Sequence, residues 1–274
     1  MTYLSVDERG HLDLDELRNA LREDTAVVSV MMANIETGVI FDVEEIGAIV
    51  KENGSVFHVD GVQAAGKLPL DLKSSTIDLF SLSGHKLHAP KGVGALYVRK
   101  GTKIRPLIVG GHQERGRRAG TENVASLAGM GVACDLAAAN IDKENSAVRD
   151  LRDRLEAGLL AAIPDTQANG DADCRLPNTT NISFKYIEGE GILLLLDRVG
   201  VAASSGSACT SGSLEPSHVL RAMGLPFTLT HGSIRFSLSR YNTRDEVDYV
   251  IKALPPIIER LRMITPFNEQ RATF

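Results

Sequence analysis

The chain has 274 residues, of which 43% are hydrophobic and 24% are charged, and its formal net charge is -5. A chain of this length and composition forms a globular protein with a substantial core. The acidic balance, without a dominant basic stripe, argues against a nucleic-acid-binding protein. The one dense basic run, Gln113–Gly120, is either a solvated loop or a contact for an anion.

The cysteines Cys134, Cys174 and Cys209 lack the paired spacing of a disulfide framework or a structural zinc site. We therefore expect a reducing compartment, the cytoplasm. No apolar stretch reaches about 18 uncharged residues, so no membrane span is expected. The opening residues lack the basic-then-apolar profile of a signal peptide.

The first half of the chain alternates helical and strand patterns. Helices are predicted at Asp13–Asp24 and at Asp42–Gly54, the second with Asp42 as N-cap and Gly54 as C′. The apolar run Thr25–Ala33 predicts a parallel strand that is buried on both faces. Further strands are predicted at Ser55–Asp60, Ile77–Ser83 and Gly92–Arg99. The order favours a mostly parallel sheet with helices on both faces, in a domain spanning 1–140.

The second half predicts a smaller α+β domain, 141–274. Its expected helices are Glu144–Ile163, Gly189–Gly200 and Arg244–Ile264, the last interrupted by Pro255 and Pro256. Strands are expected at Thr179–Tyr186 and Gly232–Ser239. A further helix is expected to begin near Glu215, with Pro216 at its first position.

Polar residues follow the predicted strands, where open α/β sheets bind ligands. Asp60 and Gln63 follow one strand, and Ser83, His85 and Lys86 follow the next. Taken singly, Asp60 could cap a turn and Lys86 could be a solvated surface lysine. Together they favour pyridoxal phosphate, because a lysine amine forms a Schiff base with a carbonyl cofactor and an aspartate pairs with a pyridinium nitrogen. Ser83 and His85 could donate hydrogen bonds to the phosphate.

Cys209 lies in the Ser/Gly-rich stretch Ala202–Gly224, which suits a nucleophile on an exposed loop. Cys134, among apolar residues, is interpreted as structural, and the acidic neighbours of Cys174 disfavour its thiolate. Arg235, on a predicted strand, could bind a substrate carboxylate or form a surface salt bridge.

Four motifs carry a resemblance that runs over nearly the whole chain: "HVDGVQAAGK", "SLSGHKLHAPKGVG", "GGHQERGRRAGTEN" and "SSGSACTSGSLEPSHV". The chain resembles the cysteine desulfurases, which are fold-type I pyridoxal-phosphate enzymes, and is most similar to their NifS branch, which supplies sulfur for nitrogenase metalloclusters. The resemblance implies part of a large α/β domain with a mostly parallel sheet, followed by a small C-terminal domain.

The resemblance also implies roles for the cofactor-binding residues. Lys86 would hold the cofactor and move protons, Asp60 would pair with the pyridine nitrogen, and Gln63 would lie beside the phenolic oxygen. Ser83 and His85 would bind the phosphate.

In the same family, the residue matching Thr121 reaches the phosphate of the neighbouring subunit, which implies a homodimer. Arg235 would bind the carboxylate of the substrate, L-cysteine. Cys209 would take its sulfur as a persulfide for an iron–sulfur scaffold or another acceptor protein, and would be a transient iron–sulfur ligand during that transfer.

The chain departs from the family in two places. The family has a leading segment, about a third of its length, that contributes a phosphate-binding turn and a histidine stacked on the cofactor. We expect this chain to be a fragment, a truncated product or a product of a mis-assigned start. In addition, Ile35 stands where the family has an asparagine, so that an amide hydrogen bond near cofactor and substrate is lost.

These features predict a cysteine desulfurase that gives L-alanine and an enzyme persulfide for iron–sulfur or nitrogenase cluster assembly. One alternative is a catalytically impaired remnant that only docks scaffold partners. Another is an enzyme similar to selenocysteine lyase.

Overall fold

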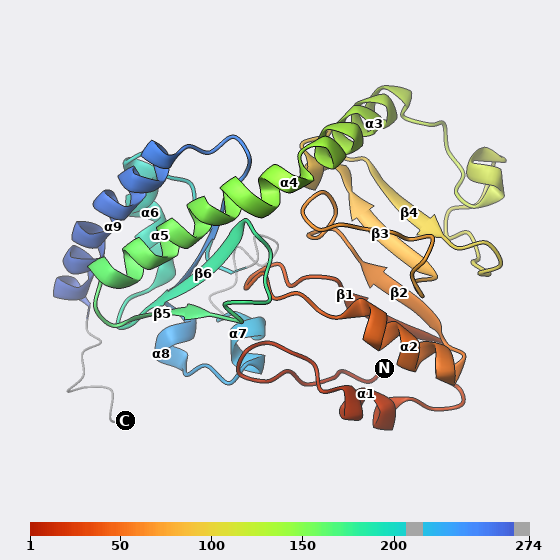
Figure 1. Ribbon diagram of the computed structural model, residues 1–274, viewed down its shortest axis with the longest axis horizontal. Coiled ribbons are helices and arrows are strands. Elements are labelled where there is room, and N and C mark those ends of the chain that lie inside the picture. The colour runs from red at the N-terminus through yellow and green to blue at the C-terminus, as the bar shows by residue number, and fades with distance from the viewer. Residues whose placement is uncertain (207–215, 266–274) are drawn as a thin grey trace. The chain divides into compact units, whose positions relative to one another are not determined.

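The structure is a computed structural model that describes residues 1–206 and 216–265. The chain divides into two compact units (Figure 1). The four-stranded unit comprises Arg18–Met32 and Asp42–Ile141, and the three-stranded unit comprises Met1–Leu17, Ala33–Phe41 and the described part of Asp142–Phe274. Two segments that the sequence analysis assigned to 1–140 therefore belong to the unit formed by the second half of the chain.

The four-stranded unit is built on one sheet with the strand order β1-β2-β3-β4. β1, β2 and β3 are parallel, and β4 is antiparallel to β3, which confirms a mostly parallel sheet. Helix α2 packs on β2 and has the predicted ends, with Asp42 accepting from the N–H groups of Glu44 and Glu45 and Gly54 left-handed at φ 83°. The elements are β1 (Val27–Met31), α2 (Val43–Asn53), β2 (Val56–Asp60), β3 (Leu79–Ser83), η1 (Gly84–Leu87), β4 (Gly94–Val98), η2 (Gln113–Gly116) and α3 (Val124–Ala139).

Two predictions for this part of the chain are wrong. β1 is not buried on both faces, because Val27 is 53% exposed and Met31 is 39% exposed. Among the described residues β1 pairs only with β2, so it is an edge strand. The first helix, α1 (Leu14–Ala20), stops short of the predicted Asp24 because the hydroxyl of Thr25 accepts from the N–H of Arg22 and closes a turn there.

The buried carboxylate of Asp78 connects α2, β2 and the start of β3. Asp78 is 7% exposed, and its two oxygens accept from Lys51 Nζ on α2 at 2.6 Å and from the N–H of Phe57 on β2 at 2.8 Å. Its own N–H donates to the carbonyl of Phe57, and its carbonyl accepts from the N–H of Arg99. This residue therefore fixes the register of β3 between both of its neighbours.

We predict that Asp78→Ala destabilises the four-stranded unit by about 2 kcal/mol, because it leaves the buried N–H of Phe57 unsatisfied and removes the carboxylate that the 40% exposed Lys51 binds. Urea unfolding followed by circular dichroism measures the change. The exposed Asp71→Ala is the control and should change the stability by less than about 1 kcal/mol. Equal effects of the two substitutions would contradict this role of Asp78.

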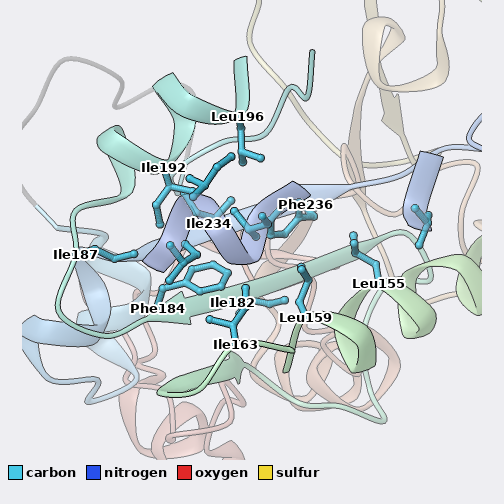
Figure 2. Packing of buried hydrophobic residues seen from close by; sticks show 14 of the residues in the cluster. Leu155, Leu159, Ile163, Ile182, Phe184, Ile187, Ile192, Leu196, Ile234 and Phe236 are labelled. Atoms are coloured by element: carbon cyan, nitrogen blue, oxygen red, sulfur yellow. The ribbon is translucent and has the colours of Figure 1, made fainter. Parts of the chain in front are cut away.

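The three-stranded unit contains an antiparallel sheet with the order β5-β6-β7 and two chemically different faces. Ile182 and Phe184 of β6 and Ile234 of β7 point to one face and pack against α5, α6 and α9 (Figure 2). The alternate residues, which include Asn181 of β6 and Arg235 of β7, lie on the other face. All of β6 is buried, so both faces are covered.

The elements of this unit follow the prediction with five differences, the first of which is that α8 was not predicted. β5 was not predicted; the helix of residues 144–163 begins with a π-helical turn; α9 is not interrupted at Pro255 and Pro256; and α7 begins at His218, capped by Ser217. Burial of Leu254 and Ile258 on either side of the prolines keeps α9 in one piece. The elements are η3 (Glu144–Val148), α5 (Arg149–Ala162), β5 (Thr166–Asn169), β6 (Thr179–Phe184), α6 (Gly189–Arg198), α7 (His218–Ala222), α8 (Phe227–Thr230), β7 (Ser233–Ser237) and α9 (Arg244–Ile264), with α4 (Ile141–Lys143) before them.

Asp171 anchors the N-terminal segment to the three-stranded unit. Its carboxylate binds His11 Nε2 at 2.7 Å and Arg9 at 2.6 Å, and it accepts from the N–H groups of Asp173 and Cys174. Burial by itself would raise the pKa of Asp171, but the hydrogen bonds from His11 and the two N–H groups, with the charge of Arg9, outweigh burial and hold this pKa well below its ordinary value.

Because the pKa of Asp171 is lower in the folded than in the unfolded state, its contribution to stability is present above the unfolded pKa and is lost as the pH falls below about 4. We predict that Asp171→Asn lowers the free energy of unfolding at pH 6 by about 1 kcal/mol. Below about pH 4, the free energy of unfolding of the variant should fall less steeply with decreasing pH than that of the wild type. Thermal unfolding across this range measures both effects. If Asp171→Asn and the exposed Asp173→Asn give parallel curves, the role of Asp171 is contradicted.

Within the described residues no single helix is long and apolar enough to span a membrane, although α3 and the helix that follows it meet the criteria of length and composition as a pair.

Candidate active site

The parallel pairing of β2 with β3 brings two predicted site segments to one sheet edge. Asp60, the last residue of β2, is in register with Ser81 of β3, and the N–H of Gly61 donates to the carbonyl of Ser81 at 2.9 Å. Ser83 ends β3, and η1, with His85 and Lys86, follows at once. The carboxylate of Asp60 and the lysine turn therefore leave the same edge of the sheet, as the sequence predicts.

A small apolar cluster packs the segment with Gln63 against the segment with Lys86. Ala65 and Leu87 are buried together with Ala133 and Ala137 of α3. Gly66, at φ 73°, has no room for a side chain, because a Cβ there would lie 2.6 Å from Leu87 and 2.9 Å from Ala137. The two turns are thus held side by side beneath α3.

The turn at Lys86 has a defined backbone. Gly84 donates to the carbonyl of Val93 at 2.9 Å, and a Cβ at Gly84 would meet Val93 within 3.0 Å. His88 closes the turn in the left-handed conformation, at φ 66°. Ser83 Oγ lies 2.7 Å from His85 Nδ1, so the two side chains proposed as phosphate ligands are neighbours.

The side-chain amide of Gln63 is the feature of this edge that best indicates a bound ligand. Its Nε2 is buried and has no hydrogen-bond partner. A buried amide donor without an acceptor is costly, so such atoms usually meet a ligand or a water. An oxygen acceptor on the cofactor ring would satisfy this atom. The acceptor Asp60, with the possible donors Gln63, Ser83, His85 and Lys86, therefore fits pyridoxal phosphate.

His58 belongs to this edge and was missed from the sequence. Its Nδ1 is 2.8 Å from Ser29 Oγ and its Nε2 is 3.3 Å from Ser81 Oγ, so it bridges β1, β2 and β3. Burial lowers the pKa of His58, and the opposing charge of Asp60 does not compensate. The signal was available, because residues i and i+2 of a strand share a face, which places His58 beside Asp60.

Gly61, directly after Asp60, lies against the buried core of the four-stranded unit. A Cβ at Gly61 would lie 1.7 Å from the ring of Phe80, which is fully buried. We predict that Gly61→Ala destabilises the unit by about 1–3 kcal/mol through overpacking. The control is Gly131→Ala on α3, where nothing lies within 4 Å of the added atom, and where alanine should stabilise by up to about 1 kcal/mol. Thermal unfolding that ranks the two variants the other way would contradict the prediction.

The remaining predicted residues lie elsewhere. Thr121 is exposed in the four-stranded unit, two positions before Asn123, the N-cap of α3. Cys209 lies outside the described residues, and with it the prediction that this cysteine binds iron. Among the residues that the structure describes, no group of His, Cys, Asp and Glu could hold a metal ion.

Arg235 lies on β7 in the three-stranded unit. Its backbone pairs with Ser204, and its Nη1 donates to the carbonyl of Ile35 at 3.1 Å. The side chain of Arg235 is half-buried, and it bonds a backbone carbonyl of its own unit. Because the contact is made by the backbone of Ile35, it does not depend on the side chain that replaces the family's asparagine.

Glu36 and Ser217 are a second pair that the sequence did not reveal. Glu36 is 1% exposed, and Ser217 Oγ donates to its carboxylate. Ser217 is also the N-cap of α7, because it accepts from the N–H of Leu220. The contact fixes the start of α7 on the segment that carries Ile35.

Comparison with known proteins agrees with this geometry. The aminotransferase class-V family model matches residues 1–250. A cysteine desulfurase of Nostoc sp. is 62% identical over 99% of this chain and 68% of its own length, and the cysteine desulfurase NifS of Azotobacter vinelandii is 60% identical over 96% of this chain and 66% of its own length.

Solved structures are similar as well. A NifS-like protein matches with a TM-score of 0.87 and 40% identity, over 95% of this chain and 68% of that chain. A NifS-like protein of Rickettsia africae matches with a TM-score of 0.86 and 35% identity, over 93% of this chain and 69% of that chain.

The chain belongs to the aminotransferase class-V family. Within it, the relatives at about 60% identity are cysteine desulfurases, which confirms the resemblance and the α/β fold class predicted from the sequence. The chain spans about two thirds of the length of these relatives.

Proposed function

We propose that the chain acts as a pyridoxal-phosphate-dependent cysteine desulfurase. The observation that carries this proposal is the buried, unpartnered Nε2 of Gln63 beside the turn of Lys86, in a chain about 60% identical to cysteine desulfurases. When bound, the cofactor supplies an electron sink for cleaving bonds next to an amino-acid nitrogen.

The residues of the chain bind and orient. Asp60, held by the N–H of Val62 at 2.9 Å, would pair with the protonated ring nitrogen. Gln63 would donate to the ring oxygen, and Ser83 and His85 would donate to the phosphate. Lys86 would hold the cofactor carbon through Nζ and move protons at that atom.

Sulfur transfer is assigned to Cys209. L-cysteine and the thiol of Cys209 would give L-alanine and a Cys209 persulfide: the substrate C–S bond breaks, one S–S bond forms, and the thiol proton ends on the products. Arg235 would hold the substrate carboxylate. The persulfide would then pass to a sulfur-acceptor protein for iron–sulfur or nitrogenase cluster assembly, as the name of the NifS relative suggests.

A homodimer and a cytoplasmic location complete the proposal. The exposure of Thr121 supports its reaching the phosphate of a second copy. No disulfide joins the described cysteines, Cys134 and Cys174, which suits a reducing compartment.

We predict that the chain purified with pyridoxal phosphate shows a visible absorption band and releases alanine from L-cysteine, and that Lys86→Ala abolishes both. Lys91→Ala is the matched control, an exposed lysine in the same segment, and should keep both signals. The proposal fails if no band forms at any cofactor concentration, or if the two lysine variants behave alike.

Ile35 favours the alternative of an impaired remnant that only docks a scaffold, because isoleucine cannot supply an amide. We predict that Ile35→Asn raises kcat/KM for alanine release about tenfold, the value of one restored hydrogen bond. Ile40→Asn, at a half-buried position of the same segment, is the control and should not raise it. Cofactor-independent capture of a cluster scaffold without any alanine release would support the remnant instead. Comparing product formation from cysteine and selenocysteine separates the lyase-like alternative.

A further inference from the structure

The polar face of the β5-β6-β7 sheet contains a row of three side chains that ends at Arg235. Asn169 of β5 is in register with Asn181 of β6, and Asn181 is in register with Arg235 of β7. Cross-strand neighbours in antiparallel pairs share a face and lie within side-chain reach. Asn181, on the central strand β6, therefore lies between Asn169 and Arg235 in the row.

The side chain of Asn181 is a fully buried amide whose oxygen has a hydrogen-bond partner and whose nitrogen has none. Asn169 Nδ2 donates to Asn181 Oδ1 at 2.7 Å and to Ser183 Oγ at 2.7 Å, and Gln167 Nε2 donates to Asn169 Oδ1 at 3.2 Å. Asn181 is 0% exposed, and its Nδ2 has no hydrogen-bond partner. Since Oδ1 is directed to Asn169 on one side, Nδ2 is directed to the β7 side, where Arg235 stands.

The amide groups of Gln167, Asn169 and Asn181 can each be turned by 180°, which exchanges their oxygen and nitrogen and reverses the direction of every hydrogen bond between them. In the reversed direction Asn181 Nδ2 donates to Asn169 Oδ1, Asn169 Nδ2 donates to Gln167 Oε1, and Asn181 Oδ1 is directed to β7. A guanidinium has only donors, so an oxygen is the group that suits it there. The reversed direction gives the Nδ2 groups of Asn169 and Asn181 an acceptor each and directs an acceptor to Arg235, while the amide nitrogen of the exposed Gln167 turns to solvent.

We propose that Asn181 is a positioning residue for Arg235: its amide oxygen accepts from the guanidinium and, with the carbonyl of Ile35, orients the fork that binds a carboxylate. The contact to Ile35 fixes Nη1. A second contact fixes the plane of the group, and a planar fork binds a carboxylate in two parallel hydrogen bonds only when that plane is set. The inference rests on the proposed function only in naming the substrate carboxylate as the ligand.

The test measures the reactivity of Arg235 without cofactor or substrate. Phenylglyoxal modifies arginine side chains, and peptide mass spectrometry gives the labelling rate of each one. We expect Asn181→Leu to raise the rate at Arg235 about tenfold, as removal of one hydrogen bond to a charged group does. Arg152, 3% exposed on α5, is the internal control in the same digest and should be unchanged. Ser183→Ala is the matched variant, because Ser183 shares the strand, the face and the Asn169 contact but is in register with Ser233.

An unchanged rate at Arg235 in Asn181→Leu, a parallel rise at Arg152, or an equal rise in Ser183→Ala would overturn the proposal. Asn181→Asp decides the question if the leucine variant does not fold: its carboxylate accepts from Arg235, so labelling slower than in the wild type supports the proposal and an equal or faster rate overturns it.

Kinetics provide a second readout. If the chain releases alanine, Asn181→Leu should raise KM for cysteine about tenfold with kcat changed less than about twofold, because the lost contact orients the group that binds substrate. Loss of kcat without a change in KM would overturn the proposal. An inactive wild-type chain would refute the proposed function and leave the labelling result to decide this inference.

Discussion

The carboxylate of Asp78 is the constraint on which the candidate site depends. It binds Lys51 of α2 and the N–H of Phe57 in β2 from a position at the start of β3. These contacts set where β3 begins relative to β2, and the parallel register then places Asp60 opposite Ser81. Because η1 follows β3 without a linker, this register also determines where His85 and Lys86 lie.

In both units, alternate residues of each strand point to opposite faces of the sheet, but the two sheets differ in what covers those faces. In the three-stranded unit helices pack on the apolar face of β6 (Figure 2). The polar face of the same sheet carries Arg235. In the four-stranded unit Phe57, Val59 and Phe80 are fully buried on one face, while Asp60 lies on the other with the exposed Val27, Met31 and Leu96. Asp60 ends β2 on this face, and the carboxyl ends of parallel strands are where open α/β sheets bind ligands.

Much of this arrangement could be predicted from the sequence, since period, caps and strand ends are local signals. Asp42 and Gly54 predicted the ends of α2. The polar residues that follow two strands predicted that Asp60 and Lys86 leave the same edge of the sheet. The features that were predicted wrongly depend on contacts with residues that are distant in the sequence. β1 is apolar yet exposed because it pairs on one side only among the described residues, and the prolines of α9 are tolerated because its buried face holds the helix.

The site residues that the sequence missed have the same cause. His58 has a local signal, its spacing from Asp60, but its bridge between Ser29 and Ser81 depends on sheet register. The contact of Glu36 with Ser217 and the place of Asn181 beside Arg235 join residues far apart in sequence. Such contacts follow from tertiary packing and have no signature in a short window of sequence.

The central claim is that Lys86 is the residue that binds pyridoxal phosphate. The most direct measurement is to add the cofactor, reduce with borohydride, and map the phosphopyridoxyl group by peptide mass spectrometry. We predict the group on Lys86, and on neither Lys91 nor Lys100 of the same segment. Labelling spread over exposed lysines, or none at Lys86 under saturating cofactor, would contradict it.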